Sequence, residues 1–219
     1  MWNKFLLVFI AVFLYSISLI AQKDSTFFKS NFYIGLQYGM SWNDVQFSSP
    51  QVEQEIFQGQ RLSFVLRYVS DPHLGIQLEL GYDQRGWIEQ KESFGSNYSR
   101  SIDYAELAFF THISIGNGFI QPVILLGSYF SYPIGEKEIY PSEWATDPSF
   151  YYGKPLPERL QFGLAGGLGF EFCPKNTPIS LLVDGRYRSS LAGIFSTNES
   201  FTFSNSRGFM VQLSGMYQF

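Results

Sequence analysis

The sequence contains very little cysteine or histidine. Cys173 is the single cysteine, and His73 and His112 are the two histidines, among 219 residues. One cysteine cannot form an internal disulfide, and these three residues do not supply the four ligands of a tetrahedral zinc site. A disulfide scaffold and a structural zinc site are therefore not expected, and nothing in the sequence suggests a bound cofactor.

Charge is also scarce. Asp, Glu, Lys and Arg together make up 16% of the chain, and the formal net charge is −4. A protein that binds nucleic acid needs a basic patch or stripe that neutralises phosphates, and the basic residues of this chain form none. We therefore expect no nucleic-acid partner.

One long apolar run is present, over residues 5–20, after a single lysine and before a polar stretch. With the small residue Ala21, it has the features of a secretory signal peptide, and it is shorter than the roughly 20 residues of a membrane-spanning helix. We expect a signal peptide over residues 1–21 and one domain over residues 22–219; an uncleaved anchor is the alternative. The rest of the chain has no comparable run, so any membrane insertion must use strands.

Aromatic residues, in contrast, reach 19% of the chain, and many recur at every second position. Residues 208–219 read GFMVQLSGMYQF, in which alternate residues back from Phe219 are mostly apolar and the others mostly small or polar. A period of two indicates a strand with one apolar and one polar face. We interpret this segment as the last strand of a transmembrane barrel, closing on the first, and expect the barrel-assembly machinery to recognise it.

The same alternation recurs seven times earlier in the chain. Each segment sets apolar residues on one face against small, polar or charged residues on the other. The facing of the fifth segment is ambiguous, because both of its faces are apolar. The eight predicted strands cover residues 31–42, 60–69, 74–87, 101–114, 119–132, 159–172, 178–190 and 208–219.

The connections between these segments alternate in length. Short ones lie near residues 70–73, 115–118 and 173–177, and long ones near residues 43–59, 88–100, 133–158 and 191–206. Short turns at one end and long loops at the other are typical of outer-membrane barrels. The sequence therefore predicts an all-β fold, an eight-stranded antiparallel transmembrane β-barrel surrounded by lipid in the outer membrane of a Gram-negative bacterium.

The second face of the strands carries glycine, alanine and charges of both signs. Such a set can form ion pairs across a narrow lumen, where an unpaired charge would be costly. We predict a lumen charge network formed by Arg61, Arg67, Glu79, Asp83, Arg85, Glu106, Glu171, Asp184, Arg186 and Arg188. A filled lumen favours a closed barrel. The alternatives are a small transport channel that uses these charges for selectivity, and a soluble lipocalin-like barrel with its apolar faces inside.

No group of residues has the spacing of a catalytic site. His112 is expected to face the lumen near Ser114, but no orienting acid is implied, so a structural histidine is the favoured interpretation. The segment GLAGGLG at residues 163–169 lacks the strand-loop-helix setting of a dinucleotide-binding loop. We therefore expect that the protein is not an enzyme.

The long connection over residues 133–158 is the strongest candidate for binding a ligand or partner, because it is rich in aromatic residues. Packing over the barrel mouth is the alternative for the same side chains. The candidate residues are Tyr140, Trp144, Phe150, Tyr151 and Tyr152.

Several segments share the pattern of one known family. They are LGIQLELGYDQRGW (residues 74–87), IDYAELAFFTHIS (102–114), RLQFGLAGGLGFEF (159–172), LLVDGRYRSSLAGIF (181–195) and the terminal GFMVQLSGMYQF. With these segments, the chain after the signal peptide resembles the PorT-like outer-membrane β-barrels of Bacteroidetes. It departs from them at Ala105 and Ala108, where Leu and Pro are usual, and at Thr111-His112, where a Lys is common. The resemblance implies the barrel fold and the outer-membrane location. We expect a structural or interaction role through the long extracellular loops, in an envelope or secretion assembly.

Overall fold

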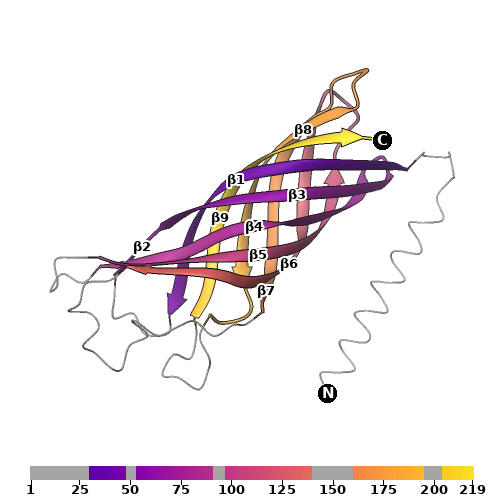
Figure 1. Ribbon diagram of the computed structural model, residues 1–219. Helices are drawn as coiled ribbons and strands as arrows, with labels where there is room; N and C mark the ends of the chain where they lie inside the picture. Colours follow the sequence, from indigo (N-terminus) through magenta and orange to yellow (C-terminus); the bar gives the residue numbers. More distant parts are fainter. Residues whose placement is uncertain (1–29, 48–52, 91–96, 140–159, 195–203) are drawn as a thin grey trace, which may run out of the picture.

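The computed structural model describes residues 30–47, 53–90, 97–139, 160–194 and 204–219, and nearly all of them lie in strands (Figure 1). Within these ranges no helix has the length and hydrophobicity to cross a membrane. The strands are β1 (Asn31–Phe47), β2 (Glu53–Glu55), β3 (Phe57–Asp71), β4 (Leu74–Gln90), β5 (Tyr98–Ser114), β6 (Ile120–Ile139), β7 (Gln161–Phe172), β8 (Ile179–Ser190) and β9 (Ser204–Gln218).

The strands form one closed antiparallel sheet. Its order is β4-β3-β1-β9-β8-β7-β6-β5, and β5 pairs back onto β4. The three residues of β2 pair with β4 and precede β3 by one residue, so β2 and β3 together count as one barrel strand. The first and last strands pair from Tyr33–Gln218 to Phe47–Ser204. The predicted eight-stranded antiparallel barrel, closed between its first and last strands, is confirmed.

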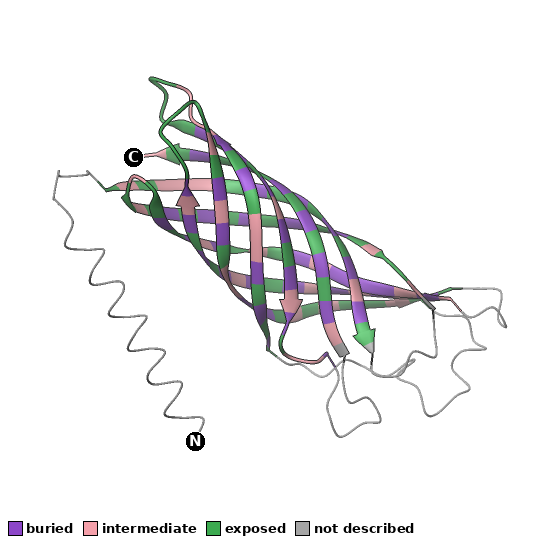
Figure 2. Cartoon of the chain, turned by 180° about the vertical axis from the view of Figure 1, so that it is seen from behind, coloured by how far each residue is buried: buried purple, intermediate pink, exposed green. Residues whose placement is uncertain are grey.

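Apolar side chains point outward and polar side chains inward. Leu36 is 64% and Leu80 58% exposed, whereas their chain neighbours Gln37 and Glu79 are fully buried. Figure 2 shows this alternation of buried and exposed positions along the strands. A closed wall with an apolar outer face satisfies its backbone hydrogen bonds internally and suits a lipid surrounding. The lipocalin-like alternative requires the opposite facing and is therefore excluded.

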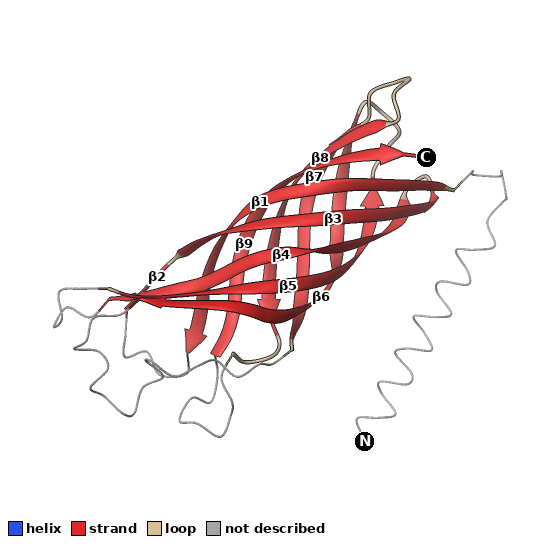
Figure 3. Cartoon of the chain, viewed as in Figure 1, coloured by secondary structure: helices blue, strands red, loops and turns tan. Residues whose placement is uncertain are grey.

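The short turns and the carboxyl terminus of the chain gather at one end of the barrel (Figure 3). Two of these turns contain a residue with positive φ, Gly116 at 81° and Asn176 at 66°. Glycine and asparagine tolerate this left-handed backbone better than other residues, and it lets the chain reverse within a few positions. At this end the observed strand ends lie within two residues of the predicted ones.

At the opposite end six of the eight barrel strands run further than predicted, whereas β7 begins at Gln161 instead of residue 159 and β8 ends at Ser190 as predicted. β1 continues to Phe47 instead of residue 42 and β6 to Ile139 instead of residue 132, while β5 begins at Tyr98 instead of residue 101. The predicted long connections were therefore wrong where they adjoin these strands, because those residues belong to the strands. The predicted strand ends were placed where the alternating apolar residues of the outer face stop, and the strands continue past that point. The ladder of backbone hydrogen bonds needs no apolar side chains, and β5 and β6 remain paired as far as Ser99–Ile139.

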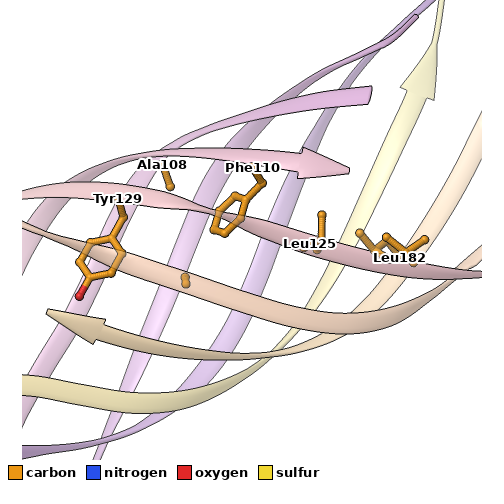
Figure 4. Packing of buried hydrophobic residues seen from close by; sticks show 7 residues of the cluster. Ala108, Phe110, Leu125, Tyr129 and Leu182 are labelled. Carbon is orange, nitrogen blue, oxygen red and sulfur yellow. The ribbon is translucent and has the colours of Figure 1, made fainter. Parts of the chain in front are cut away.

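One side of the lumen is packed with apolar side chains from β5, β6, β7 and β8 (Figure 4). The inward position of Val123, Leu125 and Tyr129 resolves the ambiguous facing of β6. The buried charges of the lumen come mainly from β3, β4 and β8. The cluster consists of Ala108, Phe110, Val123, Leu125, Tyr129, Ala165 and Leu182.

Candidate functional site

All ten residues of the predicted lumen charge network lie inside the barrel, and each is at most 4% exposed. β3, β4 and β8 supply eight of them, and β5 and β7 supply one each. They occupy every second position of their strands, so the pleat of each strand directs them to the same side. Each of the ten forms at least one ion pair with another member.

Glu79 lies at the centre of the network. Arg61 Nη2 and Arg186 Nη1 each lie 2.8 Å from its carboxylate oxygens, and Gln77 Nε2 donates to Oε1 at 2.5 Å. Arg186 also pairs with Asp184 and places its guanidinium 4.3 Å from the centroid of the Phe110 ring. Each buried charge here thus has an opposite charge beside it, as a low-dielectric interior requires.

A second group of charges lies nearer the long-loop end. Asp83 accepts from Arg85 and Arg188, both at 2.5 Å, and Glu106 pairs with Arg61 and Arg85, which connects this group to the centre. The Arg85 guanidinium also lies 4.8 Å and 4.9 Å from the ring centroids of Tyr104 and Tyr129. These contacts hold it between the charged and the apolar sides of the lumen.

A third group lies near the short turns. Arg67 Nη1 donates to both oxygens of Glu171, at 2.7 and 2.9 Å. Glu171 also contacts His112 Nε2 at 3.2 Å and accepts from Ser180 Oγ at 2.8 Å. Arg67 Nε donates to Gln77 Oε1 at 2.9 Å, and Gln77 bonds in turn to Glu79. The polar contacts therefore run without a break through the lumen, and His112 has the structural surroundings expected of it.

The buried charges of the described residues balance. Six arginines face six carboxylates, since Arg100 and Glu89 join the ten predicted residues. Opposite charges therefore compensate each other among the described lumen residues, as a low-dielectric interior requires.

A further polar cluster near the long-loop end was missed by the sequence analysis. Trp87 Nε1 donates to Glu89 at 2.7 Å, Tyr98 Oη donates to Glu138 at 2.7 Å, and Arg100 pairs with Glu136. Most of these residues lie beyond the predicted strand ends. Extending the period of two past those ends is the signal that would have found them.

The uncharged polar members of the network were also missed. Each occupies an inward position of its strand, so the alternation alone could have identified them. They are Gln37, Asn43, Gln77, Ser131, Ser180, Gln212 and Ser214.

The remaining predictions for functional residues have different outcomes. The glycine-rich segment at residues 163–169 forms part of strand β7, so it is not a phosphate-binding loop. Among the residues that the structure describes, no group of three or more His, Cys, Asp or Glu could hold a metal ion. The aromatic residues predicted for loop interactions, Tyr140, Trp144, Phe150, Tyr151 and Tyr152, lie outside the described ranges.

Comparisons with known proteins agree with this fold. The structure is similar to the outer membrane protein OprG from Pseudomonas aeruginosa. The match covers 87% of this chain and 96% of that chain, with 12% sequence identity and a TM-score of 0.55. Two further matches are weaker. Ail of Yersinia pestis has 14% sequence identity, with 84% of this chain and 98% of that chain covered and a TM-score of 0.46. The E. coli outer membrane protein W has 12% sequence identity, with 89% of this chain and 100% of that chain covered and a TM-score of 0.42. A search of curated protein sequences found no match.

The family comparison covers most of the sequence. Residues 20–196 match the family described as outer membrane protein beta-barrel domain. The match extends from the region before β1 to beyond the end of β8. The chain therefore belongs to the outer membrane protein beta-barrel domain family and is a small β-barrel of the outer membrane.

Proposed function

We propose that this protein is a closed barrel that anchors surface loops in the outer membrane and acts through them in an envelope assembly. In this proposal it neither conducts solutes nor catalyses a reaction. The observation that carries the proposal is the packing of the lumen, where a charge-balanced network of buried side chains lies beside an apolar cluster. Small eight-stranded barrels have interiors that side chains can fill completely.

A conductance measurement tests the closed state. We expect the protein purified in detergent, once incorporated into planar bilayers, to give no unitary current steps, while a known porin in the same bilayers does. Steady unitary steps would overturn the proposal and favour the small transport channel. In that case, replacing Arg188 with Gln should change the ion selectivity, because this residue lies in the lumen.

We further propose that the protein is a PorT-like barrel of Bacteroidetes with a role in an envelope or secretion assembly. Support comes from four of the segments that carry the resemblance, at residues 74–87, 102–114, 159–172 and 208–219, which contribute to the wall of one barrel. The candidate contact residues are those of the long connection between β6 and β7, Tyr140, Trp144, Phe150, Tyr151 and Tyr152.

A loop replacement tests this role. We would replace residues 141–158 with a Gly/Ser linker of equal length in the native host and compare cross-linked envelope proteins and secreted proteins with the wild type. Loss of a specific cross-link or of secretion, while the barrel still migrates as a folded species, is the expected result. Unchanged cross-links and secretion would contradict an interaction through this loop.

Strand β9 is the segment that we propose the barrel-assembly machinery recognises. The outward Tyr217 of β9 and Phe219, which directly follows the strand, lie 5.5 Å apart between ring centroids, and Phe219 is 74% exposed. We expect Phe219→Ala to lower the amount of protein in the outer membrane, measured by immunoblotting of membrane fractions. Wild-type levels of the variant would contradict this role.

A further inference from the structure

On strands β1 and β9, at the long-loop end, the apolar outer face ends with an aromatic pair followed by an ion pair. Trp42 and Phe209 are paired in register, and their ring centroids lie 6.3 Å apart in a stacked arrangement. At the next outward position, Arg207 donates to both carboxylate oxygens of Asp44. Aromatic side chains gather where a membrane meets water. This carboxylate therefore lies at the level of the lipid headgroups, and the chain itself supplies its cation.

Strands β4, β5 and β6, which lie side by side (Figure 1), begin the same sequence of outward residues. The aromatic residues here are Tyr82 and Tyr132, and both are exposed on the outer wall. At the next outward position of β5 lies Asp103, which is paired in register with Gln84 on one side and Gly135 on the other. Asp103 is therefore a second carboxylate at the headgroup level of the wall.

Asp103 has hydrogen-bond partners but no cation. Its Oδ1 accepts from Tyr82 Oη at 2.5 Å and from Gln84 Nε2 at 3.1 Å, and both donors are neutral. None of the ion pairs among the described residues includes Asp103. The two bonds draw the carboxylate toward β4, whereas the exposed Lys137 belongs to β6, on the other side of β5. A charge without a counter-charge beside the apolar layer is costly, and a cation that reaches it removes this cost.

The second carboxylate oxygen of Asp103, Oδ2, is open to a ligand. It accepts no hydrogen bond from the described residues, and it is not among the partnerless side-chain atoms that are closed off from solvent. The pairing of β5 with β6 shifts between Asp103 and Tyr104, which places Gly135 beside Asp103. A Cβ atom at residue 135 would lie 3.2 Å from Oδ2. The glycine therefore leaves space in front of this oxygen.

We propose that Asp103 binds the ammonium group of a phosphoethanolamine-type lipid headgroup through Oδ2. The long loops of outer-membrane barrels are extracellular, so the lipid belongs to the outer leaflet. It supplies the cation that Arg207 supplies to Asp44. A primary ammonium combines three N–H donors with a positive charge, and charge-assisted hydrogen bonds are the strong ones.

Lys137 is placed to contact the phosphate of the same headgroup. It is paired in register with Ser101, so it is the diagonal neighbour of Asp103 across β5 and β6. Diagonal neighbours lie about 7–8 Å apart. The outer wall thus presents a negative and a positive group side by side, which matches the opposite charges of a zwitterionic headgroup.

Competition between two lipids with identical acyl chains tests the donor chemistry. We would add equal amounts of phosphatidylethanolamine and phosphatidylcholine to the purified, delipidated protein in detergent and count the retained lipids by native mass spectrometry. The two headgroups carry the same charges, but the choline nitrogen has no N–H donor. We expect the wild-type protein to retain phosphatidylethanolamine in about fivefold excess.

Two variants and one matched control locate the site. Asp103→Asn removes the charge but keeps an oxygen that can accept the two hydrogen bonds from β4. Gly135→Val keeps the charge but covers Oδ2. Both variants should retain the two lipids equally. Asp44→Asn removes an outward carboxylate that already has Arg207 as its partner, and it should leave the preference unchanged.

Migration of unboiled samples on a denaturing gel verifies that each variant is folded. Equal retention of the two lipids by the wild-type protein would overturn the proposal, as would an unchanged preference in folded Asp103→Asn. Stronger retention of phosphatidylglycerol than of phosphatidylethanolamine would also overturn it, because that headgroup is an anion without an ammonium group. None of these results affects the conductance test of the closed barrel, so the two proposals fail separately.

Discussion

At the scale of single residues, buried carboxylates in this barrel are stable because several donors reach each of them. Glu79 is fully buried and accepts from Arg61, Arg186 and Gln77. Bringing the charges together out of water costs free energy that their mutual attraction only partly returns. Removing one partner should therefore lower the stability of the protein by more than the intact network adds to it.

Replacing Glu79 with Leu leaves Arg61 and Arg186 without their shared partner in the lumen. We expect the free energy of unfolding to fall by about 3–5 kcal/mol. Urea unfolding in lipid vesicles, followed by tryptophan fluorescence, measures it. The control is Glu55→Gln at an exposed position of β2, which should change stability by less than about 0.5 kcal/mol. A loss for Glu79→Leu as small as that of the control would contradict the central role of Glu79.

The single thiol should react slowly at neutral pH. Cys173 lies in the turn after β7, where burial and the nearby charge of Glu171 raise its pKa to about 11. The thiol form is therefore favoured, and the nucleophilic thiolate appears only as the pH approaches that value. We expect alkylation to accelerate with pH well beyond 9 in the folded protein. An alkylation profile with its midpoint near the ordinary value of about 8.5 would contradict this assignment.

At the scale of secondary-structure elements, β6 and β7 depend on a small residue where a large side chain lies over the neighbouring strand. Tyr129 of β6 is paired in register with Gly163 of β7, and its ring lies over that glycine. A Cβ atom at residue 163 would lie 2.5 Å from the Tyr129 hydroxyl and 2.3 Å from the Ser189 carbonyl oxygen. The glycine thus makes room for a buried aromatic side chain next to the charge network.

Gly163→Ala should therefore destabilise the barrel, by about 1–3 kcal/mol, because the Tyr129 ring and the backbone of β8 must both shift. Gly215→Ala is the matched control, since a Cβ there meets only Leu181 Cδ2, at 3.8 Å. Urea unfolding of both variants measures the difference. Equal stability of the two variants would show that β7 can move away from Tyr129 at little cost.

At the scale of the whole molecule, closure of the sheet determines how the barrel unfolds. Every strand of the ring pairs with two neighbours, including β1 with β9 and β4 with β5. A ring without free edges has no terminal strand from which unfolding can start, and its interior is tied together by ion pairs across the lumen. We therefore regard the barrel as kinetically stable in detergent.

This closure predicts heat-modifiable migration. The protein purified from membranes should run faster on a denaturing gel when it is unboiled, because the compact barrel survives the detergent, and more slowly after boiling. Extraction from membranes should require detergent, since its outer face is apolar. Recovery in the soluble fraction, with identical migration of both samples, would contradict a closed membrane barrel.

The sequence by itself determined the fold class, the number of strands and the facing of most of them. The period of two is a local property of each strand, and it placed the ten lumen charges on inward positions without reference to any neighbour. It also predicted the strand ends at the short turns, because glycine, proline and asparagine mark those reversals. The signal peptide over residues 1–21 remains a prediction, since it lies outside the described residues.

Only the tertiary structure decided which charges pair and how far the strands extend. Arg67 and Glu171 are 104 residues apart in the chain, and their contact depends on the diameter and register of the closed ring. The facing of β6 depends on the same closure, because it arises from side chains that meet across the lumen. Alternation along a strand assigns each side chain to a face, but its partner across the lumen is fixed only when the ring closes.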